Sequence, residues 1–170
     1  MAHSLPKAIL FDMDDTILAY SQNSENSWRA VSERFAERFS ALAPEAVAKA
    51  IKVSASEYWR DAERHRVGRL NMDLTRQQIV ADALTGLGID DQPLALEIAL
   101  AYAAHREDAI TPFPGALETL RELRNRGVRL ALLTNGSAAI QRRRVEKHEL
   151  PSYLSLIHIS EPTRQAESRM

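Results

Sequence analysis

Two short apolar runs, with a long helical stretch between them, organise the hydrophobic pattern of this chain. Residues 8–11 and 128–133 form the runs, and each leads directly into polar residues. Short apolar runs bounded by turn residues are typical of buried strands in a parallel sheet. Between them, apolar residues recur every three or four positions, as in amphipathic helices. The pattern predicts an α/β fold with a helical insertion after its first strand.

The insertion is expected to hold four helices. Their apolar stripes are Trp28, Val31, Phe35 and Phe39; Val47, Ile51, Ala55, Tyr58 and Ala62; Ile79, Val80, Ala83 and Leu87; and Leu94, Ile98, Ala101 and Tyr102. Pro44 is expected to open the second helix, Asp73 to cap the third and Gly88 to end it. After the insertion, Pro114-Gly115 and Gly127 bound a helix with Leu117, Leu120 and Leu123 in one apolar row. We therefore divide the chain into 1–19 (core, first part), 20–109 (helical cap), 110–153 (core, second part) and 154–170 (tail).

Two carboxylates follow the first run. Strand alternation sends Asp12 and Asp14 to one side of the chain, at the strand's carboxyl end, where open α/β sheets bind ligands. Such a pair can hold a hard cation, or divide the roles of nucleophile and proton donor. The alternative is an acidic turn without chemistry.

The second run ends in Thr134-Asn135-Gly136-Ser137, just before a further helical segment. A hydroxyl and free backbone amides at the start of a helix are favourable ligands for phosphate. The sequence therefore predicts a phosphate site beside the two carboxylates.

Together the two motifs resemble those of the haloacid dehalogenase (HAD) superfamily, which is mostly composed of magnesium-dependent phosphatases. Residues 11–18 resemble the first motif and residues 134–137 the second. The resemblance implies a HAD-like Rossmannoid fold, with a doubly wound parallel sheet. A helical insertion between the two motifs is similar to the cap of subfamily I.

The resemblance also implies roles for single residues. Asp12 would be the nucleophile that forms an aspartyl-phosphate, and Asp14 the general acid and base. The Asp12 carboxylate and the Asp14 backbone carbonyl would hold Mg²⁺. Thr134, Asn135 and Gly136 would bind the phosphoryl oxygens.

Asp14 further narrows the expected chemistry. Dehalogenases of the family carry Tyr at this position and phosphonatases carry Ala, so Asp resembles hydrolysis of phosphate monoesters or phosphosugar mutation. The sequence around residues 134–137 and Gln141-Arg142 is most similar to the nucleotidase and sugar-phosphate phosphatase branch. We expect a small phosphorylated metabolite as the substrate. A run of basic residues in the cap supplies two candidates for its recognition, Arg64 and Arg66. The alternative, which we favour at this stage, is a solvated helix face whose charge is offset by Asp61 and Glu63.

Two further family motifs, a lysine and an acidic pair that completes the magnesium site, have no match after Tyr153. Lys147 lies among Arg142, Arg143 and Arg144, and this charge run is expected to be a solvated helix face. We therefore expect a truncated core that is inactive or nearly so by itself. The strand that carries the acidic motif should pair beside the first strand, and its loss would leave an open edge and poor solubility. The alternative is a non-catalytic HAD-like domain that binds a ligand or partner.

We interpret residues 154–170 as a tail of non-native origin. Read back into DNA, residues 154–164 give a string that resembles a transposase-type sequencing adaptor, which predicts a non-native tail. The competing interpretation is the third strand of the family, which Leu156, Ile157 and Ile159 imitate.

Composition excludes several classes of function. The formal net charge of −1 gives no reason to expect nucleic acid or an anionic membrane as a partner, and the absence of cysteine excludes thiolate chemistry. No apolar run is long enough for a signal peptide or a membrane span, so a cytoplasmic protein is expected. No pattern in the sequence indicates an oligomeric state.

Overall fold

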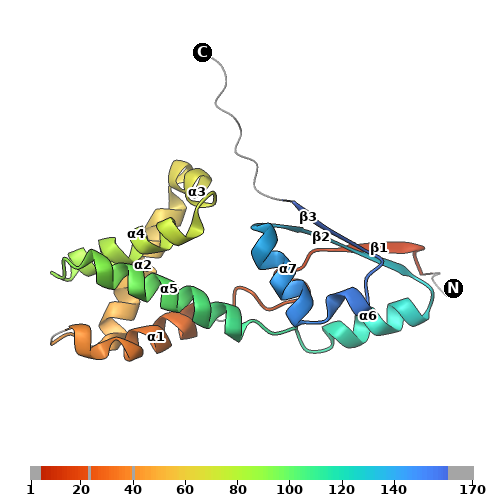
Figure 1. Cartoon of the computed structure of the whole chain (residues 1–170), viewed down its shortest axis with the longest axis horizontal. Coiled ribbons are helices and arrows are strands. Elements are labelled where there is room, and N and C mark those ends of the chain that lie inside the picture. Colours follow the sequence, from red (N-terminus) through yellow and green to blue (C-terminus); the bar gives the residue numbers. More distant parts are fainter. Residues whose placement is uncertain (1–4, 23, 40, 161–170) are drawn as a thin grey trace, which may run out of the picture. The chain divides into compact units, whose positions relative to one another are not determined.

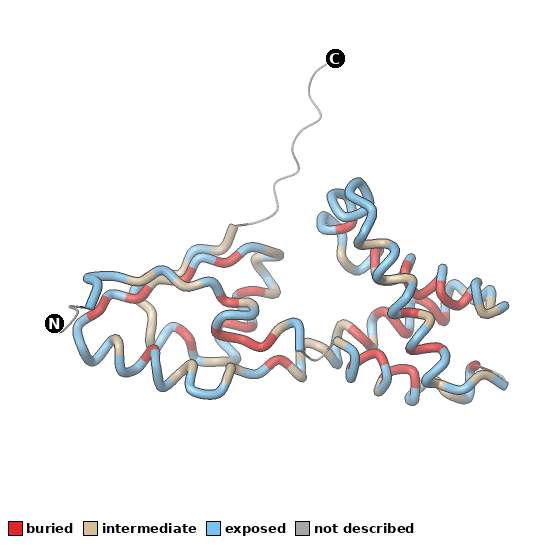
Figure 2. Tube along the Cα trace, turned by 180° about the vertical axis from the view of Figure 1, so that it is seen from behind, coloured by how far each residue is buried: buried red, intermediate tan, exposed pale blue. Residues whose placement is uncertain are grey.

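The computed structural model describes residues 5–22, 24–39 and 41–160, which form two compact units. Unit 1 contains the described residues up to Ser21 and from Ile110 onward, and unit 2 is Gln22–Ala109. Each unit has its own hydrophobic core, and the buried stretches of both traces are marked in Figure 2. No helix in the described ranges has the length and apolar character needed to cross a membrane.

Unit 1 is built on a parallel sheet of three strands, β1 (Ala8–Phe11), β2 (Arg129–Asn135) and β3 (Leu156–Ser160). Their order is β1-β2-β3, with Ala8 opposite Arg129 and Leu132 opposite Ile157 (Figure 1). Helices α6 (Ala116–Asn125) and α7 (Ala138–Lys147) precede and follow β2, and a short 3-10 turn, η2 (Leu150–Ser152), leads to β3. The predicted α/β class and parallel sheet are confirmed.

Both helices of the described core lie on the same side of this sheet (Figure 1). The reason is topological: crossovers are right-handed, and two of them that step in one direction place both helices on one face. Leu130 and Leu132 point to that face and are buried, whereas Leu10, Leu133 and Leu156 are 60%, 43% and 62% exposed. A doubly wound fold has helices on both faces of the sheet. That arrangement would need a further strand on the other side of β1, so that the strand order reverses there.

Helix α6 begins and ends where the glycines predict. Gly115 precedes it with φ of +81°, a left-handed conformation that favours glycine, and Gly127 follows it with φ of +80°. Leu120 is 2% exposed and packs into the unit 1 core together with the partly buried Leu117 and Leu123. The predicted apolar row is therefore the buried face of this helix.

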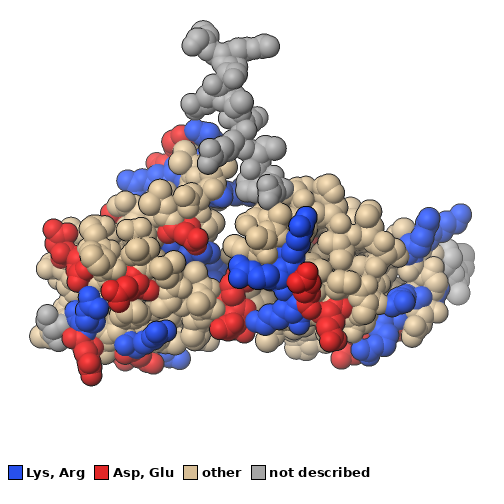
Figure 3. Space-filling view, viewed as in Figure 1, with Lys and Arg blue, Asp and Glu red and all other residues tan. Residues whose placement is uncertain are grey.

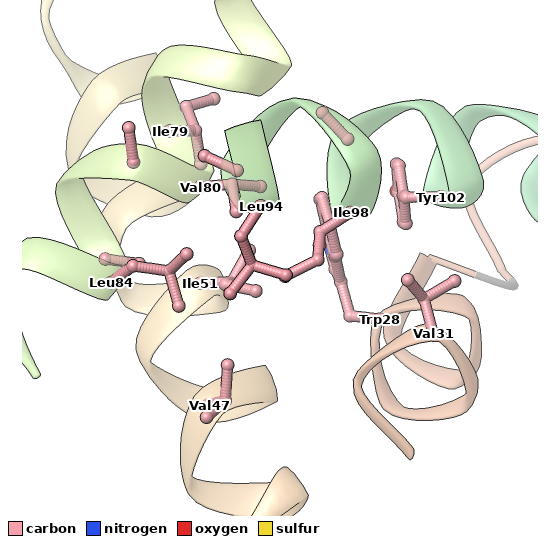
Figure 4. Close-up of a cluster of buried hydrophobic side chains, with 14 of the residues drawn as sticks. Trp28, Val31, Val47, Ile51, Ile79, Val80, Leu84, Leu94, Ile98 and Tyr102 are labelled. Atoms are coloured by element: carbon pink, nitrogen blue, oxygen red, sulfur yellow. The ribbon is translucent and has the colours of Figure 1, made fainter. Parts of the chain in front are cut away.

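The regular elements of unit 2 among its described residues are all helices. Unit 2 contains α1 (Ser24–Arg34), the 3-10 helix η1 (Ala36–Phe39), α2 (Pro44–Arg60), α3 (Ala62–Gly68), α4 (Met72–Gly86) and α5 (Gln92–Ala109). The predicted stripes supply its core, shown in Figure 4. Trp28 and Tyr102 stack there with ring centroids 3.5 Å apart. Both rings are almost fully buried, so Trp28 is a core residue, as the stripe predicts.

Two predicted details of unit 2 are wrong. Ala62 does not continue the second helix, because Asp61 is extended and its side chain accepts a hydrogen bond from the Arg64 amide at 2.8 Å, which starts the separate helix α3. The cap of α4 is Asn71 rather than Asp73, since the Asn71 side chain accepts from the Leu74 amide at 3.2 Å. In both cases the helix start is set by a capping side chain, which the spacing of apolar residues does not reveal.

Strand β3 lies in the segment for which two origins were considered. It forms a regular parallel pairing with β2 over five residues, as the family interpretation of this segment expects. The adaptor origin of residues 154–170 is a statement about the coding DNA and stays a prediction. Residues 161–170 lie outside the described part of the chain.

His148, just after α7, makes stability depend on pH. Burial, together with the charges of Lys147 and Arg144, lowers its pKa below the usual 6.5, and its Nε2 is buried without a hydrogen-bond partner among the described residues. As the pH falls, the unfolded chain therefore protonates His148 at a higher pH than the folded chain does. The contribution of neutral His148 to stability is complete above pH 6.5 and is lost as the pH drops through the folded pKa. We expect His148→Gln to flatten this part of the pH dependence in urea denaturation of the chain. An unchanged slope between pH 7 and 5 would contradict it.

Candidate active site

The acidic motif forms a tight turn directly after β1. The Met13 carbonyl accepts hydrogen bonds from the Ile17 and Leu18 amides, each at 2.9 Å, and the Met13 side chain is fully buried. Asp15 adopts φ of +57°, and its carboxylate accepts hydrogen bonds from the amide and hydroxyl of Ser21. Asp15 thus stabilises the turn, while Asp12 and Asp14 alternate with buried Met13.

Asp12 is one of the residues that line a pocket near the carboxyl ends of the strands, together with the apolar residues Leu10, Phe11 and Leu133. The pocket has a volume of about 410 Å³, and its polar lining comes from Asp12, Thr134, Asn135 and Ser160. Asp12 is exposed, and its Oδ1 accepts a hydrogen bond from the Met13 amide at 2.7 Å. The structure therefore brings one of the two predicted carboxylates together with two of the predicted phosphate ligands.

Asp14 points to α7 rather than into this pocket. Arg144 Nη1 lies 3.1 Å from both Oδ1 and Oδ2 of Asp14, and the Arg144 side chain is only 7% exposed. Its guanidinium also lies 4.7 Å from the centre of the Tyr20 ring. The prediction that Arg142–Arg144 form a solvated face is wrong for Arg144, although Arg142, Arg143 and Lys147 are exposed.

Gln141 connects Asp14 with the second motif. Its Nε2 donates to the Asn135 carbonyl at 2.8 Å and lies 3.2 Å from Asp14 Oδ2 and 3.3 Å from Thr134 Oγ1. Gln141 is 3% exposed and Thr134 is 3% exposed. Sequence reasoning assigned no role in the site to Gln141 or Arg144. The available signal was their spacing of three, which places both on one face of a helix.

Gly136 is held in place by two neighbours. Its amide donates to the Ser160 carbonyl at 3.0 Å, so this proton is used within the sheet and is not directed at the pocket. Its φ is +137°, and a Cβ at this position would lie 3.1 Å from Gln141 Nε2. Of the three predicted phosphate ligands, Gly136 is thus the one with a structural role in this geometry.

We expect Gly136→Ala to destabilise unit 1 by about 1–3 kcal/mol, because it combines an unfavourable φ with pressure on the Gln141 side chain. Chemical denaturation of the variant beside the parent measures this. Gly86→Ala is the matched control, since no atom lies within 4 Å of its added Cβ and the residue is helical. Equal stability of the two alanine variants would contradict the prediction.

The donor set fits magnesium in part. Asp12 Oδ2 accepts no hydrogen bond within the described ranges, so this oxygen is available to a cation. Among the same residues, no group of three or more His, Cys, Asp or Glu side chains could enclose a metal. Magnesium keeps several waters and usually takes only one or two protein carboxylates together with substrate phosphate. Asp12 and a main-chain carbonyl of this turn are therefore sufficient for part of such a site.

The two basic candidates of the cap differ in their surroundings. Arg64 lies on the rim of a second pocket, of about 450 Å³, between α2 and α4, which also includes Lys49, Glu57 and Asp82. Arg66 instead pairs with Glu63 through Nε at 3.0 Å and Nη2 at 2.7 Å, one turn apart on an exposed face of α3. On the face shown in Figure 3, acidic and basic side chains are interspersed, which fits the near-zero net charge.

Unit 1 is a parallel α/β core in which the acidic end of β1 and the Thr134-Asn135 end of β2 share one pocket. The model of the haloacid dehalogenase-like hydrolases matches residues 6–169, which is almost the whole chain. The chain belongs to this family.

Curated relatives are similar over most of the chain. The ribulose-1,5-bisphosphate 5-phosphatase of Halopiger xanaduensis is 30% identical over 165 residues, which cover 93% of this chain and 64% of the relative. The glyceraldehyde 3-phosphate phosphatase of Methanopyrus kandleri is 28% identical over 160 residues, which cover 91% and 62%. The chain spans less than two thirds of the length of either relative.

Solved structures share the fold. HAD-hydrolase YfnB from Bacillus subtilis, solved with bound magnesium, is similar with a TM-score of 0.61 at 23% identity, over 90% of this chain and 63% of that one. L-2-haloacid dehalogenase from Xanthobacter autotrophicus is similar with a TM-score of 0.50 at 21% identity, over 92% and 57%.

Proposed function

We propose that this chain is part of a magnesium-dependent phosphatase that hydrolyses small phosphate monoesters of the sugar-phosphate or nucleotide type. The observation that best supports the proposal is the shared pocket of Asp12 and Thr134, because it offers a nucleophile and a phosphate ligand to one bound group. Both curated relatives are named as phosphatases of phosphorylated sugars, which favours that substrate class.

In the first half of the proposed reaction, a carboxylate oxygen of Asp12 attacks phosphorus and the bond from phosphorus to the substrate's alkoxy oxygen breaks. Asp14, protonated at this stage, gives its proton to that oxygen, so an alcohol leaves and Asp12 carries the phosphoryl group. The Thr134 hydroxyl and the Asn135 amide stabilise the phosphoryl oxygens. Magnesium, held by the Asp12 carboxylate and the Asp14 carbonyl, would offset their negative charge.

In the second half, water attacks the phosphorus of the aspartyl-phosphate. Asp14, now a carboxylate, takes a proton from this water, the bond from phosphorus to the Asp12 oxygen breaks, and inorganic phosphate leaves. Asp12 and Asp14 then return to their starting states.

We further propose that the 170-residue chain is inactive or nearly so, because its described residues offer neither a lysine nor a second acidic group to the pocket. The test begins with the source DNA, sequenced across the codon for Tyr153 by a route without library adaptors. The complete reading frame and the 170-residue chain are then assayed with magnesium on a panel of sugar phosphates and nucleotides.

Activity of the complete frame that is lost with EDTA, and its near-absence in the 170-residue chain, would support both proposals. Comparable activity of the short chain would contradict the truncation. A reading frame that truly ends after Met170, with no activity on any ester, would favour the non-catalytic alternative instead.

Arg64 and Arg66 provide a test of substrate recognition by the cap. Because Arg64 lies at a pocket and Arg66 is paired with Glu63, we propose that only Arg64 contacts the substrate. Arg64→Ala in the complete frame is expected to raise KM about tenfold, the loss of one charge-assisted hydrogen bond, and Arg66→Ala to leave KM unchanged. An unchanged KM in both variants would exclude the two residues from recognition.

A further inference from the structure

Two buried side chains of α7 connect the residues to which catalysis is assigned. Gln141 and Arg144 are 3% and 6% exposed and lie one turn apart, although both belong to a segment rich in charge. Together they contact Asp14 after β1 as well as Thr134 and Asn135 at the end of β2. The proposed reaction assigns them no step, so their burial in the site needs another explanation.

The orientation of the Gln141 amide follows from its neighbours. A guanidinium has only donors, and Arg144 Nη1 lies 3.2 Å from Gln141 Oε1, so that oxygen faces Arg144 and the amino group faces the site. The amino group has two protons for three acceptors. The shortest contact, to the Asn135 carbonyl at 2.8 Å, takes one proton, and Asp14 Oδ2 and Thr134 Oγ1 share the other.

This arrangement determines the direction of the Thr134 hydroxyl. An amide nitrogen does not accept hydrogen bonds, so Thr134 Oγ1 can only act as an acceptor toward Gln141. The single hydroxyl proton of Thr134 is thereby left for another acceptor. Thr134 is also one of the residues that line the pocket of Asp12, although its side chain is 3% exposed and packs against Gln141. A hydroxyl whose proton is not used toward Gln141 can donate to a phosphoryl oxygen.

We propose that Gln141 and Arg144 are positioning residues: Arg144 orients Gln141, and Gln141 turns the Thr134 hydroxyl outward as a phosphate donor while it holds Asp14 beside it. The inference rests on the proposed function, since it presumes that phosphate binds in the pocket of Asp12 and Thr134. It extends that function to two residues that touch neither the phosphate nor the nucleophile.

The first measurement concerns the network alone and uses NMR of the 170-residue chain. The side-chain amide protons of Gln141 should exchange with water at least about tenfold more slowly than those of the exposed Gln92, because they are buried and bonded. Arg144→Gln should remove this protection. Arg143→Gln is the matched control, since it deletes the same charge from an exposed neighbour, and it should leave the protection unchanged. Unprotected Gln141 in the parent chain would overturn the inference.

The second measurement concerns phosphate. Inorganic phosphate with magnesium should shift the backbone amide signals of Thr134 and Asn135 in the parent chain. In Gln141→Glu, which keeps the shape but turns the Thr134 proton inward, the shift at the same phosphate concentration should fall about fivefold, as for a lost hydrogen bond. Gln141→Met, which removes the donor without adding charge, should give a smaller loss, and it serves if the Glu variant does not fold.

The two proposals fail in different ways. A phosphate response that is equal in the parent, Gln141→Glu and Gln141→Met, with Thr134→Val abolishing it, would overturn the positioning role and leave the phosphate site intact. No phosphate response in the parent, with Gln141 protected, would overturn the phosphate site itself. It would thereby reduce the network to a structural one.

Discussion

Asp12→Asn is expected to abolish phosphatase activity of the complete reading frame, with kcat reduced by about 10⁴-fold or more, because an amide cannot replace a carboxylate nucleophile. The substitution should not disturb the fold. Asn has nearly the same shape, its side-chain oxygen can still accept from the Met13 amide, and residue 12 is exposed. Steady-state kinetics of the purified variant, together with its denaturation midpoint, measure both expectations.

Asp15→Asn is the matched control for the nucleophile. It makes the same chemical change three residues away, at a carboxylate that stabilises the turn through Ser21 instead of lining the pocket. We expect it to lower stability while kcat falls by less than about tenfold. In addition, mass spectrometry after an acid quench should find the phosphoryl group on Asp12 in the parent. Activity of Asp12→Asn within tenfold of the parent would contradict the assigned role.

The elements of this fold could be predicted where a local pattern determines them. Two short apolar runs followed by polar turns gave β1 and β2, and Gly115 and Gly127 gave the ends of α6. Helix α3 was missed because Ala62 continues the spacing of the preceding stripe, whereas the break is made by a backbone turn at Asp61. Caps depend on one side chain and one amide, so a hydrophobic stripe contains no signal for them.

The site was predicted only as far as its motifs are contiguous in sequence. Asp12, Thr134 and Asn135 follow strand ends, and parallel strands bring such ends to one edge. The burial of Arg144 depends on Asp14, which lies 130 positions away, and a charge run gives no indication of such a partner. The sequence also did not predict that one face of the sheet lacks helices. This feature follows from the order of the strands, which no local pattern indicates.

The sheet face that α6 and α7 leave uncovered is the basis of a second prediction. We expect the purified 170-residue chain to self-associate. Leu10 on β1 pairs with Ala131 of β2, and Leu133 lies two positions further along β2 on the same face. The two leucines are 60% and 43% exposed, and neither α6 nor α7 covers this face (Figure 1). In the described part of the sheet, β1 also pairs on one side only. Exposed apolar patches and open strand edges promote association between chains. We expect light scattering to find assemblies larger than a monomer.

Leu10→Lys combined with Leu133→Lys should shift the chain toward the monomer, because charges on a sheet face and edge oppose stacking and pairing with another chain. The matched control is Leu74→Lys combined with Leu100→Lys, which adds the same charge to two helical leucines that are 60% and 52% exposed in unit 2. If association depends on the bare face of the sheet, the control pair stays assembled. A monomeric parent, or an equal effect of both pairs, would show that the exposed face does not drive association.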